Sequence, residues 1–307
     1  ATTGAAPSRA GRYSGEVNGL LILDKPAGLT SHDVVARTRR ILDERSIGHL
    51  GTLDPMATGV LPLLLGRYTR LAQFFGRMEK SYTGTIRFGQ ATTTYDAEGE
   101  AAGPYTPVTL DAVELSEHAE HFRGELLQTP PAYSAKKIGG RAAYSLARAG
   151  AVVELTPVRI QVHEFAITSV EGDTGTFRAT VSAGGYIRSL AHDLGQRMGC
   201  GAHLASLRRV AAGPFTEQAA ITLEELATLA ETGEVERHLP HPRTLLPELP
   251  AITADTHTAG RMRNGAMCNL ADFSAATHVK VFANRYELIG IAQRVAGTMF
   301  QPVVVIG

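Results

Sequence analysis

The residues with the clearest chemical potential lie in one short, glycine-rich segment, 47–59 (IGHLGTLDPMATG). It contains one histidine, His49, and one aspartate, Asp54, which could serve as an acid, a base or a nucleophile. Pro55 follows the aspartate and restricts Asp54 to extended backbone angles. The alternative is a tight surface turn in which the Asp54 side chain hydrogen-bonds its own backbone. The local chemistry leaves both interpretations open.

The elements around this segment indicate how it would be held. The apolar run 60–65 (VLPLLL) follows directly and predicts a buried strand, so segment 47–59 is a loop that leads into the core. A strand is expected at 19–24, and Ser31 is expected to cap a helix whose apolar residues recur at helical spacing. A loop anchored on core elements is a suitable platform for a catalytic carboxylate.

Length, charge and cysteine content narrow the class of protein. A chain of 307 residues suggests about two domains. No apolar run is long enough to cross a bilayer, and the first residues lack the apolar core of a secretory signal. The two cysteines, Cys200 and Cys268, have neither zinc-site spacing nor a disulfide framework, which favours the cytoplasm.

The formal net charge is zero, but the charged residues are unevenly distributed. Segment 37–45 is rich in arginine, and segment 223–236 is strongly acidic. This asymmetry would suit a polyanion bound along one side, although a solvated surface explains any single cluster equally well. A second basic cluster contains Arg123, Lys136, Lys137, Arg141 and Arg148.

The predicted elements mix strands, hairpins and helices, which indicates an α+β fold. Residues 1–18 are small, polar and glycine-rich and are expected to form a flexible tail. The proline-rich segment 239–250 marks a boundary between a domain at 19–240 and a small β-rich module at 245–307. Strands are expected at 80–88, 152–170, 174–183 and 204–210, and helices at 110–123, 141–149 and 186–198.

Several function classes lose support because their motifs are missing from the sequence. There is no phosphate-binding glycine loop followed by lysine and no dinucleotide fingerprint, which argues against ATP use and hydride transfer. No cluster with metal-ligand spacing is present, so no metal site is expected.

Taken together, the motifs resemble those of the TruB family, the bacterial tRNA pseudouridine(55) synthases. The resemblance runs in the family's order across residues 19 to about 210 and depends on the combination of motifs rather than on any one of them. The matching segments are 19–31 (GLLILDKPAGLTS), 48–62 (GHLGTLDPMATGVLP), 80–82 (KSY), 129–136 (TPPAYSAK), 184–188 (GGYIR) and 201–209 (GAHLASLRR).

The resemblance implies both a fold and a reaction. The fold would be a curved, mostly antiparallel mixed sheet with flanking helices and a central cleft for tRNA, followed by a PUA-like RNA-binding module at 245–307. The reaction would isomerise a uridine in the tRNA T-loop to pseudouridine without a cofactor, guide RNA or protein subunit. A monomer without membrane contact is expected.

The resemblance also assigns roles to residues. Asp54 would be the catalytic carboxylate, Arg188 its counter-ion, and Tyr82 the aromatic that stacks on the flipped base. His49 would fill the gap left by flipped nucleotides, Tyr186 and Leu207 would line the pocket, and Lys25 with Pro26 would support the site beside the RNA. Phosphate contacts are expected from Lys136, Lys137, Arg141 and Arg148.

Alternatives remain for residues and for the chain. Arg188 could be a surface arginine at a helix start, and Tyr82 a core tyrosine of an alternating strand. The protein could be an RNA-binding or tRNA-folding factor whose chemistry is dispensable. It could also be a guide-RNA-dependent relative, although the compact chain and bacterial motif spellings argue against this.

Overall fold

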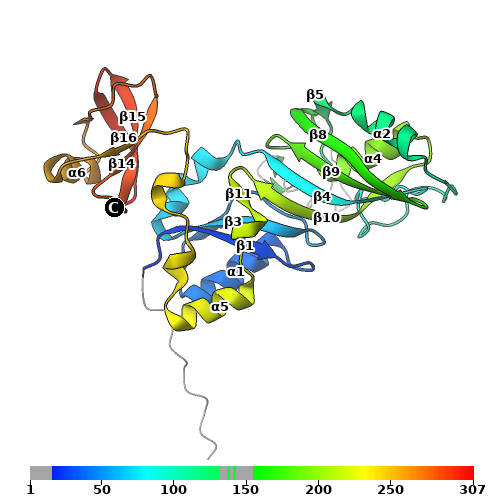
Figure 1. Ribbon diagram of the computed structural model, residues 1–307, viewed down its shortest axis with the longest axis horizontal. Helices are drawn as coiled ribbons and strands as arrows, with labels where there is room; N and C mark the ends of the chain where they lie inside the picture. The colour runs from blue at the N-terminus through cyan, green and yellow to red at the C-terminus, as the bar shows by residue number, and fades with distance from the viewer. Residues whose placement is uncertain (1–15, 132–136, 139–140, 143–154) are drawn as a thin grey trace, which may run out of the picture.

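The computed structural model describes residues 16–131, 137–138, 141–142 and 155–307 of the chain (Figure 1). These residues form two large β-sheets with helices packed against them and one small two-stranded sheet, and the predicted α+β class is confirmed. Most of the expected tail at 1–18 lies outside the described residues. No helix in the described ranges is both long and apolar enough to cross a membrane.

Nine strands of the described residues form the larger sheet, in the order β1-β3-β10-β4-β9-β8-β5, with β2 on β3 and β11 on β10. Every pair is antiparallel except β3 with β10, as expected for a mixed, mostly antiparallel sheet. The strands are β1 (Gly19–Lys25), β2 (Ile47–His49), β3 (Thr58–Leu65), β4 (Lys80–Phe88), β5 (Gly124–Gln128), β8 (Val158–Glu171), β9 (Thr174–Val181), β10 (Ala202–Ala212) and β11 (Phe215–Thr216).

Helices cover the two ends of this sheet. Helices α1 (Ser31–Leu42) and α5 (Leu223–Thr232) pack together beside β1, whereas α2 (Ala112–Glu120) and α4 (Ile187–Arg197) pack on β8 and β10 (Figure 1). The acidic segment predicted at 223–236 therefore belongs largely to α5. Short 3₁₀ helices occupy connections: η1 (Gly66–Phe75), η2 (Glu217–Ala219), η3 (Val235–His238) and η4 (Pro242–Thr244).

The second sheet is formed by the C-terminal residues. Its order is β12-β14-β15-β16-β13, and helix α6 (Thr256–Arg263) packs against it. Phe282, Leu288 and Ile306 share an apolar cluster with residues of the first sheet and of η1, such as Leu20 and Leu71. The sheet is therefore attached to the larger one through a common core. Its strands are β12 (Ala251–Thr253), β13 (Cys268–Asn269), β14 (His278–Phe282), β15 (Leu288–Ala296) and β16 (Met299–Val305).

The helix predicted at 141–149 is wrong at its start. Strand β6 (Lys137–Ile138) pairs antiparallel with β7 (Arg141–Ala142), so the first two residues of the expected helix lie in a strand. The two residues between these strands are both glycine, a sequence that favours a tight hairpin over a helix start. The rest of the predicted helix lies outside the described residues.

The cap predicted for α1 is also wrong, because Thr30 and not Ser31 is the N-cap residue. The Thr30 hydroxyl accepts from the Asp33 amide, and the Asp33 carboxylate accepts from the Thr30 amide, forming a capping box. Asp33 lies three residues after Thr30, which is the spacing that a capping box requires. Ser31 could not form the same reciprocal pair with Asp33. Ser31 is thereby left free for another contact.

Candidate active site

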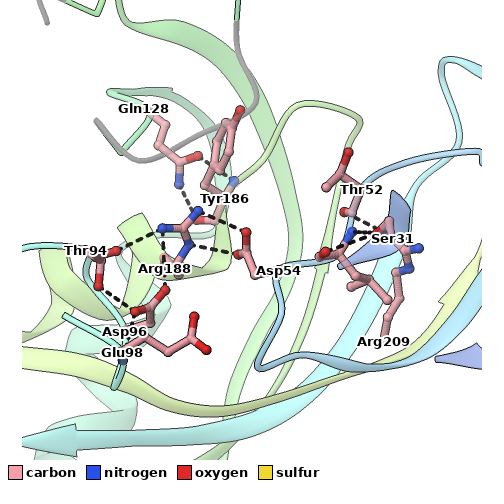
Figure 2. Close-up of polar contacts among 11 residues, drawn as sticks. Ser31, Thr52, Asp54, Thr94, Asp96, Glu98, Gln128, Tyr186, Arg188 and Arg209 are labelled. Atoms are coloured by element: carbon pink, nitrogen blue, oxygen red, sulfur yellow. Dashed lines mark hydrogen bonds and ion pairs between the residues drawn. The ribbon is translucent and has the colours of Figure 1, made fainter. Parts of the chain in front are cut away.

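The backbone around Asp54 is held by a serine and an arginine. The Ser31 hydroxyl accepts a hydrogen bond from the Leu53 amide at 2.8 Å and donates to the Leu53 carbonyl at 3.1 Å. Arg209 is fully buried and donates to the Gly51 carbonyl at 3.1 Å and to the Val60 carbonyl at 2.7 Å. These bonds fix the chain entering and leaving the loop, and Figure 2 shows Ser31 and Arg209 beside it.

Lys25 holds the same loop on the C-terminal side of Asp54. Its side chain is fully buried, and Nζ donates to the carbonyl oxygens of Pro26, Pro55 and Ala57 at 3.0, 3.2 and 2.6 Å. Burial lowers the pKa of Lys25 to about 8, while the nearby Asp54 carboxylate opposes that shift. The amine therefore supports the backbone of the Asp54 loop. The predicted contact with RNA is not available to it, because Lys25 is buried and directed at backbone carbonyls.

Replacing Lys25 with alanine should destabilise the protein. The change leaves a cavity and removes the donor for three carbonyl groups, at an expected cost of about 2–4 kcal/mol in the free energy of unfolding. Urea denaturation of Lys25→Ala measures this directly. Arg45→Ala, at an exposed position, is the control. An unchanged midpoint for Lys25→Ala would show that the clamp does not contribute to stability.

Arg188 lies between two carboxylates and contacts Asp54 at two points. Its Nε atom is 2.9 Å from Asp54 Oδ2, and its Nη2 donates to Asp54 Oδ1 at 3.2 Å. On the other side, Nη1 donates to the Thr94 carbonyl at 3.0 Å and is 3.5 Å from Asp96 Oδ2 (Figure 2). The Arg188 side chain is only 5% exposed, whereas that of Asp54 is 34% exposed. The planar fork of arginine thus fixes the orientation of a carboxylate that remains accessible.

Burial and charge act in opposite directions on Asp54. Burial raises the pKa of the Asp54 carboxyl above its ordinary value of 3.8, and the negative charge of Asp96 adds to the rise. The Arg188 guanidinium opposes both effects, since an adjacent cation favours the ionised form. The pKa of Asp54 thus stays raised overall, and its ionised form depends on Arg188.

A cavity of about 590 Å³ opens beside the Asp54–Arg188 pair. Tyr82 from β4 and Leu207 from β10 contribute to its wall, as does Tyr186 at the start of α4. The predicted pocket residues Tyr82, Tyr186, Arg188 and Leu207 therefore meet Asp54 in one place, although they come from distant parts of the chain. The walls also include two further cationic side chains, Lys80 and Arg159.

Two aromatic residues of the cavity are held by polar neighbours. Burial raises the pKa of the Tyr82 hydroxyl, and the guanidinium of Arg209, which hydrogen-bonds to it, opposes the rise. The backbone of Tyr186 is bound at both polar atoms by Gln128: Tyr186 N donates to Oε1 at 2.7 Å and Tyr186 O accepts from Nε2 at 3.0 Å. Tyr82 is 6% exposed and belongs to the apolar core, and it also lines the cavity. It is therefore both a core tyrosine and a residue of the cavity wall.

The other predicted site residues are His49 and the basic residues expected to bind phosphate. His49 ends β2 at the start of the Asp54 loop but does not line the cavity. Its ring is half-buried, and burial together with the charge of Arg209 lowers its pKa. Lys137 and Arg141 lie in the β6–β7 hairpin, and Lys136 and Arg148 fall outside the described residues.

Sequence reasoning did not single out several residues that build the site. Asp96 and Thr94 lie in a segment, 89–107, whose threonines, glycines and acids indicated only a loop. Arg209 and Lys80 belong to motifs that were recognised, yet the motifs alone gave these two side chains no role. Among the described residues, no group of three or more His, Cys, Asp or Glu side chains could hold a metal ion.

Comparison with solved structures shows that this fold also occurs in proteins of ribonucleoprotein complexes. The "Crystal structure of the archaeal box H/ACA sRNP Nop10-Cbf5 complex" superimposes with a TM-score of 0.70 at 25% identity, covering 94% of this chain and 86% of that one. The "Structure of H/ACA RNP bound to a substrate RNA containing 2'-deoxyuridine" gives a TM-score of 0.69 at 26% identity, covering 94% and 85%.

Sequence comparison then gives the family. Residues 39–187 match the TruB family pseudouridylate synthase N-terminal domain, and residues 188–247 match the tRNA pseudouridylate synthase B C-terminal domain. A protein of Solibacter usitatus named tRNA pseudouridine synthase B is 46% identical over 94% of this chain and its own full length. One of the same name from Aquifex aeolicus is 40% identical over 92% of this chain and 98% of its own. The chain belongs to the TruB family of pseudouridylate synthases.

Proposed function

We propose that this chain converts a uridine in the T-loop of tRNA to pseudouridine, and that it does so without a guide RNA, a cofactor or a protein subunit. The observation that carries the proposal is the accessible Asp54 carboxylate, held at two points by Arg188 on the wall of the cavity. Membership of the TruB family, and relatives named tRNA pseudouridine synthase B, support the same reaction.

The reaction breaks the bond between ribose C1′ and uracil N1 and forms a bond between C1′ and C5. The base returns to the ribose with a proton lost from C5 and one gained at N1, so the product is an isomer of the substrate. Asp54 supplies the carboxylate, and three routes fit its position: attack on the ribose, addition to the base, or proton removal that gives a glycal. Each route needs the ionised form that Arg188 favours.

The target uridine must leave its stack to reach Asp54, at a cost of a few kcal/mol. Tyr82 lies in the cavity wall, where stacking on the flipped base would contribute ~1–3 kcal/mol. Its hydroxyl is the candidate group for taking the C5 proton. His49, at the start of the loop, is proposed to fill the space that the nucleotide leaves.

Electrostatic contacts with the tRNA backbone would supply the remaining affinity. Lys80 and Arg159 add positive charge to the cavity wall. The basic residues Lys136, Lys137, Arg141 and Arg148 are proposed to bind phosphates, which makes affinity fall with salt. We assign catalysis to residues 19–240 and RNA binding in the manner of a PUA module to residues 245–307. The cytoplasm suits a chain whose two cysteines form no disulfide with each other.

The test is tritium release from tRNA transcripts labelled at uridine C5, with no other protein or RNA added. Release at a catalytic rate is expected, because forming the new bond displaces the C5 hydrogen. Release only after a guide RNA is supplied would identify a guide-dependent enzyme. Tight tRNA binding with no release under either condition would identify an RNA-binding factor.

The rate should fall on the acid side at a pH above the ordinary aspartate value. Since the pKa of Asp54 is raised above 3.8, its reactive ionised form disappears as the pH decreases through that raised value. Single-turnover rates with saturating enzyme, measured downward from pH 8, should show this limb while circular dichroism remains unchanged. A constant rate down to pH 4 would contradict a raised pKa at the catalytic group.

A further inference from the structure

Tyr95 and His192 form a stacked pair outside the cavity, next to the residues that hold Arg188. Their ring centroids are 3.8 Å apart and their planes differ by 15°. We propose that this stack positions Thr94 and Asp96 so that they fix the Arg188 guanidinium. This inference rests on the proposed function, since it makes the pair a positioning device for that reaction.

Helix α4 contacts the 94–96 segment at two points that lie one helical turn apart. Arg188 and His192 are four residues apart and therefore share a face of the helix. Arg188 binds the Thr94 carbonyl and approaches the Asp96 carboxylate, while the His192 ring packs on Tyr95 between them. Three consecutive loop residues are thus held by one face of a single helix.

The backbone conformation of Tyr95 explains why such a hold is needed. Its φ angle is +66°, in the left-handed region that residues other than glycine rarely adopt. This conformation brings the Thr94 carbonyl and the Asp96 carboxylate to the Arg188 guanidinium. A strained residue keeps its conformation only when surrounding contacts determine it, and the aromatic stack is one such contact.

Hydrogen bonds supply further contacts of this segment: Asp96 Oδ1 accepts from the Thr94 hydroxyl at 2.5 Å and from the Glu98 amide at 3.1 Å. The Tyr95 carbonyl accepts from the Leu204 amide at 2.9 Å, and the Ala97 amide donates to the Leu204 carbonyl at 2.9 Å. These last two bonds attach the segment to β10, yet neither restrains the direction of the Tyr95 side chain. The stack with His192 is the contact by which α4 restrains the Tyr95 side chain.

The contact is made by the flat faces of the rings and not by a hydrogen bond from the histidine. His192 Nδ1 is buried and has no hydrogen-bond partner among the described residues. Burial also lowers the pKa of His192, so the ring is neutral at pH 7. Two neutral rings in stacked geometry gain packing energy that depends on ring shape, which phenylalanine would preserve at position 95.

Substitutions at both positions test the proposal. Tyr95→Gly suits the positive φ angle but removes the ring, and His192→Ala removes the partner without touching the loop backbone. Each should lower the single-turnover rate by about tenfold or more while tRNA affinity changes little, because a misplacement of ~1 Å can cost about 100-fold. Tyr95→Phe should retain most of the rate of the unmodified protein. The double variant Tyr95→Gly/His192→Ala should be no slower than Tyr95→Gly alone. Tyr105→Ala, an exposed tyrosine of the same connection, is the control.

Hydrogen exchange gives a readout that is independent of activity. In Tyr95→Gly and in His192→Ala, the Leu204 and Ala97 amides should exchange faster than in the unmodified protein, whatever reaction the enzyme performs. Failure of the unmodified protein to form pseudouridine would refute the proposed function but leave this result interpretable. Unchanged exchange and a normal rate in both variants would overturn the positioning role, as would a Tyr95→Phe variant as slow as Tyr95→Gly.

Discussion

Asp54→Asn is expected to abolish pseudouridine formation, lowering the single-turnover rate by about 10³-fold or more, the scale found when a nucleophile or base is removed. Asparagine has nearly the same size as aspartate, so Ser31, Lys25 and Arg209 should still hold the loop. The amide, however, can neither attack carbon nor accept a proton at neutral pH. The measurement is tritium release from C5-labelled tRNA with enzyme in excess.

Affinity for tRNA separates this chemical effect from a defect in folding or binding. Because the substitution removes one negative charge beside an anionic ligand, the dissociation constant should stay the same or decrease slightly. Glu231→Gln, at an exposed position on α5, removes one acidic charge elsewhere and should leave the rate unchanged. A normal rate for Asp54→Asn would show that the carboxylate is not the catalytic group.

Arg188→Met should reduce the rate by about 10²–10³-fold, comparable to removing one donor that stabilises charge in an active site. Methionine fills much of the volume but leaves Asp54 and Asp96 without the cation between them. The effect on tRNA affinity should be small, since the Arg188 side chain is only 5% exposed and already bound to protein groups. Parallel single-turnover and equilibrium binding measurements test this difference.

The pH profile distinguishes a loss of charge from a general disturbance. Removing the guanidinium takes away the group that opposes the rise in the Asp54 pKa, so the acid limb should move to higher pH. Part of the lost rate should then return as the pH is raised. Arg188→Lys keeps a positive charge but cannot contact Asp54 at two points. Its rate and its acid limb should therefore lie between those of the unmodified protein and those of Arg188→Met. A pure loss of affinity in Arg188→Met would instead place Arg188 on the RNA surface.

Much of the architecture could be predicted, because it depends on local patterns. The Asp54 loop was evident from its glycines, Pro55 and the apolar run that becomes β3. Strand β4 showed the alternation expected of a half-buried strand, with Tyr82 and Ile86 buried on one face. Helix α6 was missed because its two buried residues, Ala259 and Met262, give too weak a periodic signal.

The site could be predicted only in part, since its organisation depends on contacts between distant segments. Nothing near Asp96 in the sequence indicates that it lies beside Arg188, as this contact requires the loop to reach β10 and α4. Ser31 looked like a helix cap, and its bonds to Leu53 became available only because Thr30 and Asp33 form the cap. The resemblance to a family provided the pairing of Arg188 with Asp54, which local spacing could not.

The most direct test of Asp54 as the catalytic group in tRNA modification is a map of pseudouridine positions in a tRNA transcript treated with each protein. The unmodified protein should produce pseudouridine at a single uridine in the T-loop, and Asp54→Asn should produce none while still binding the transcript. Modification of that uridine by Asp54→Asn, or an unmodified T-loop after treatment with the wild-type chain, would contradict the proposal.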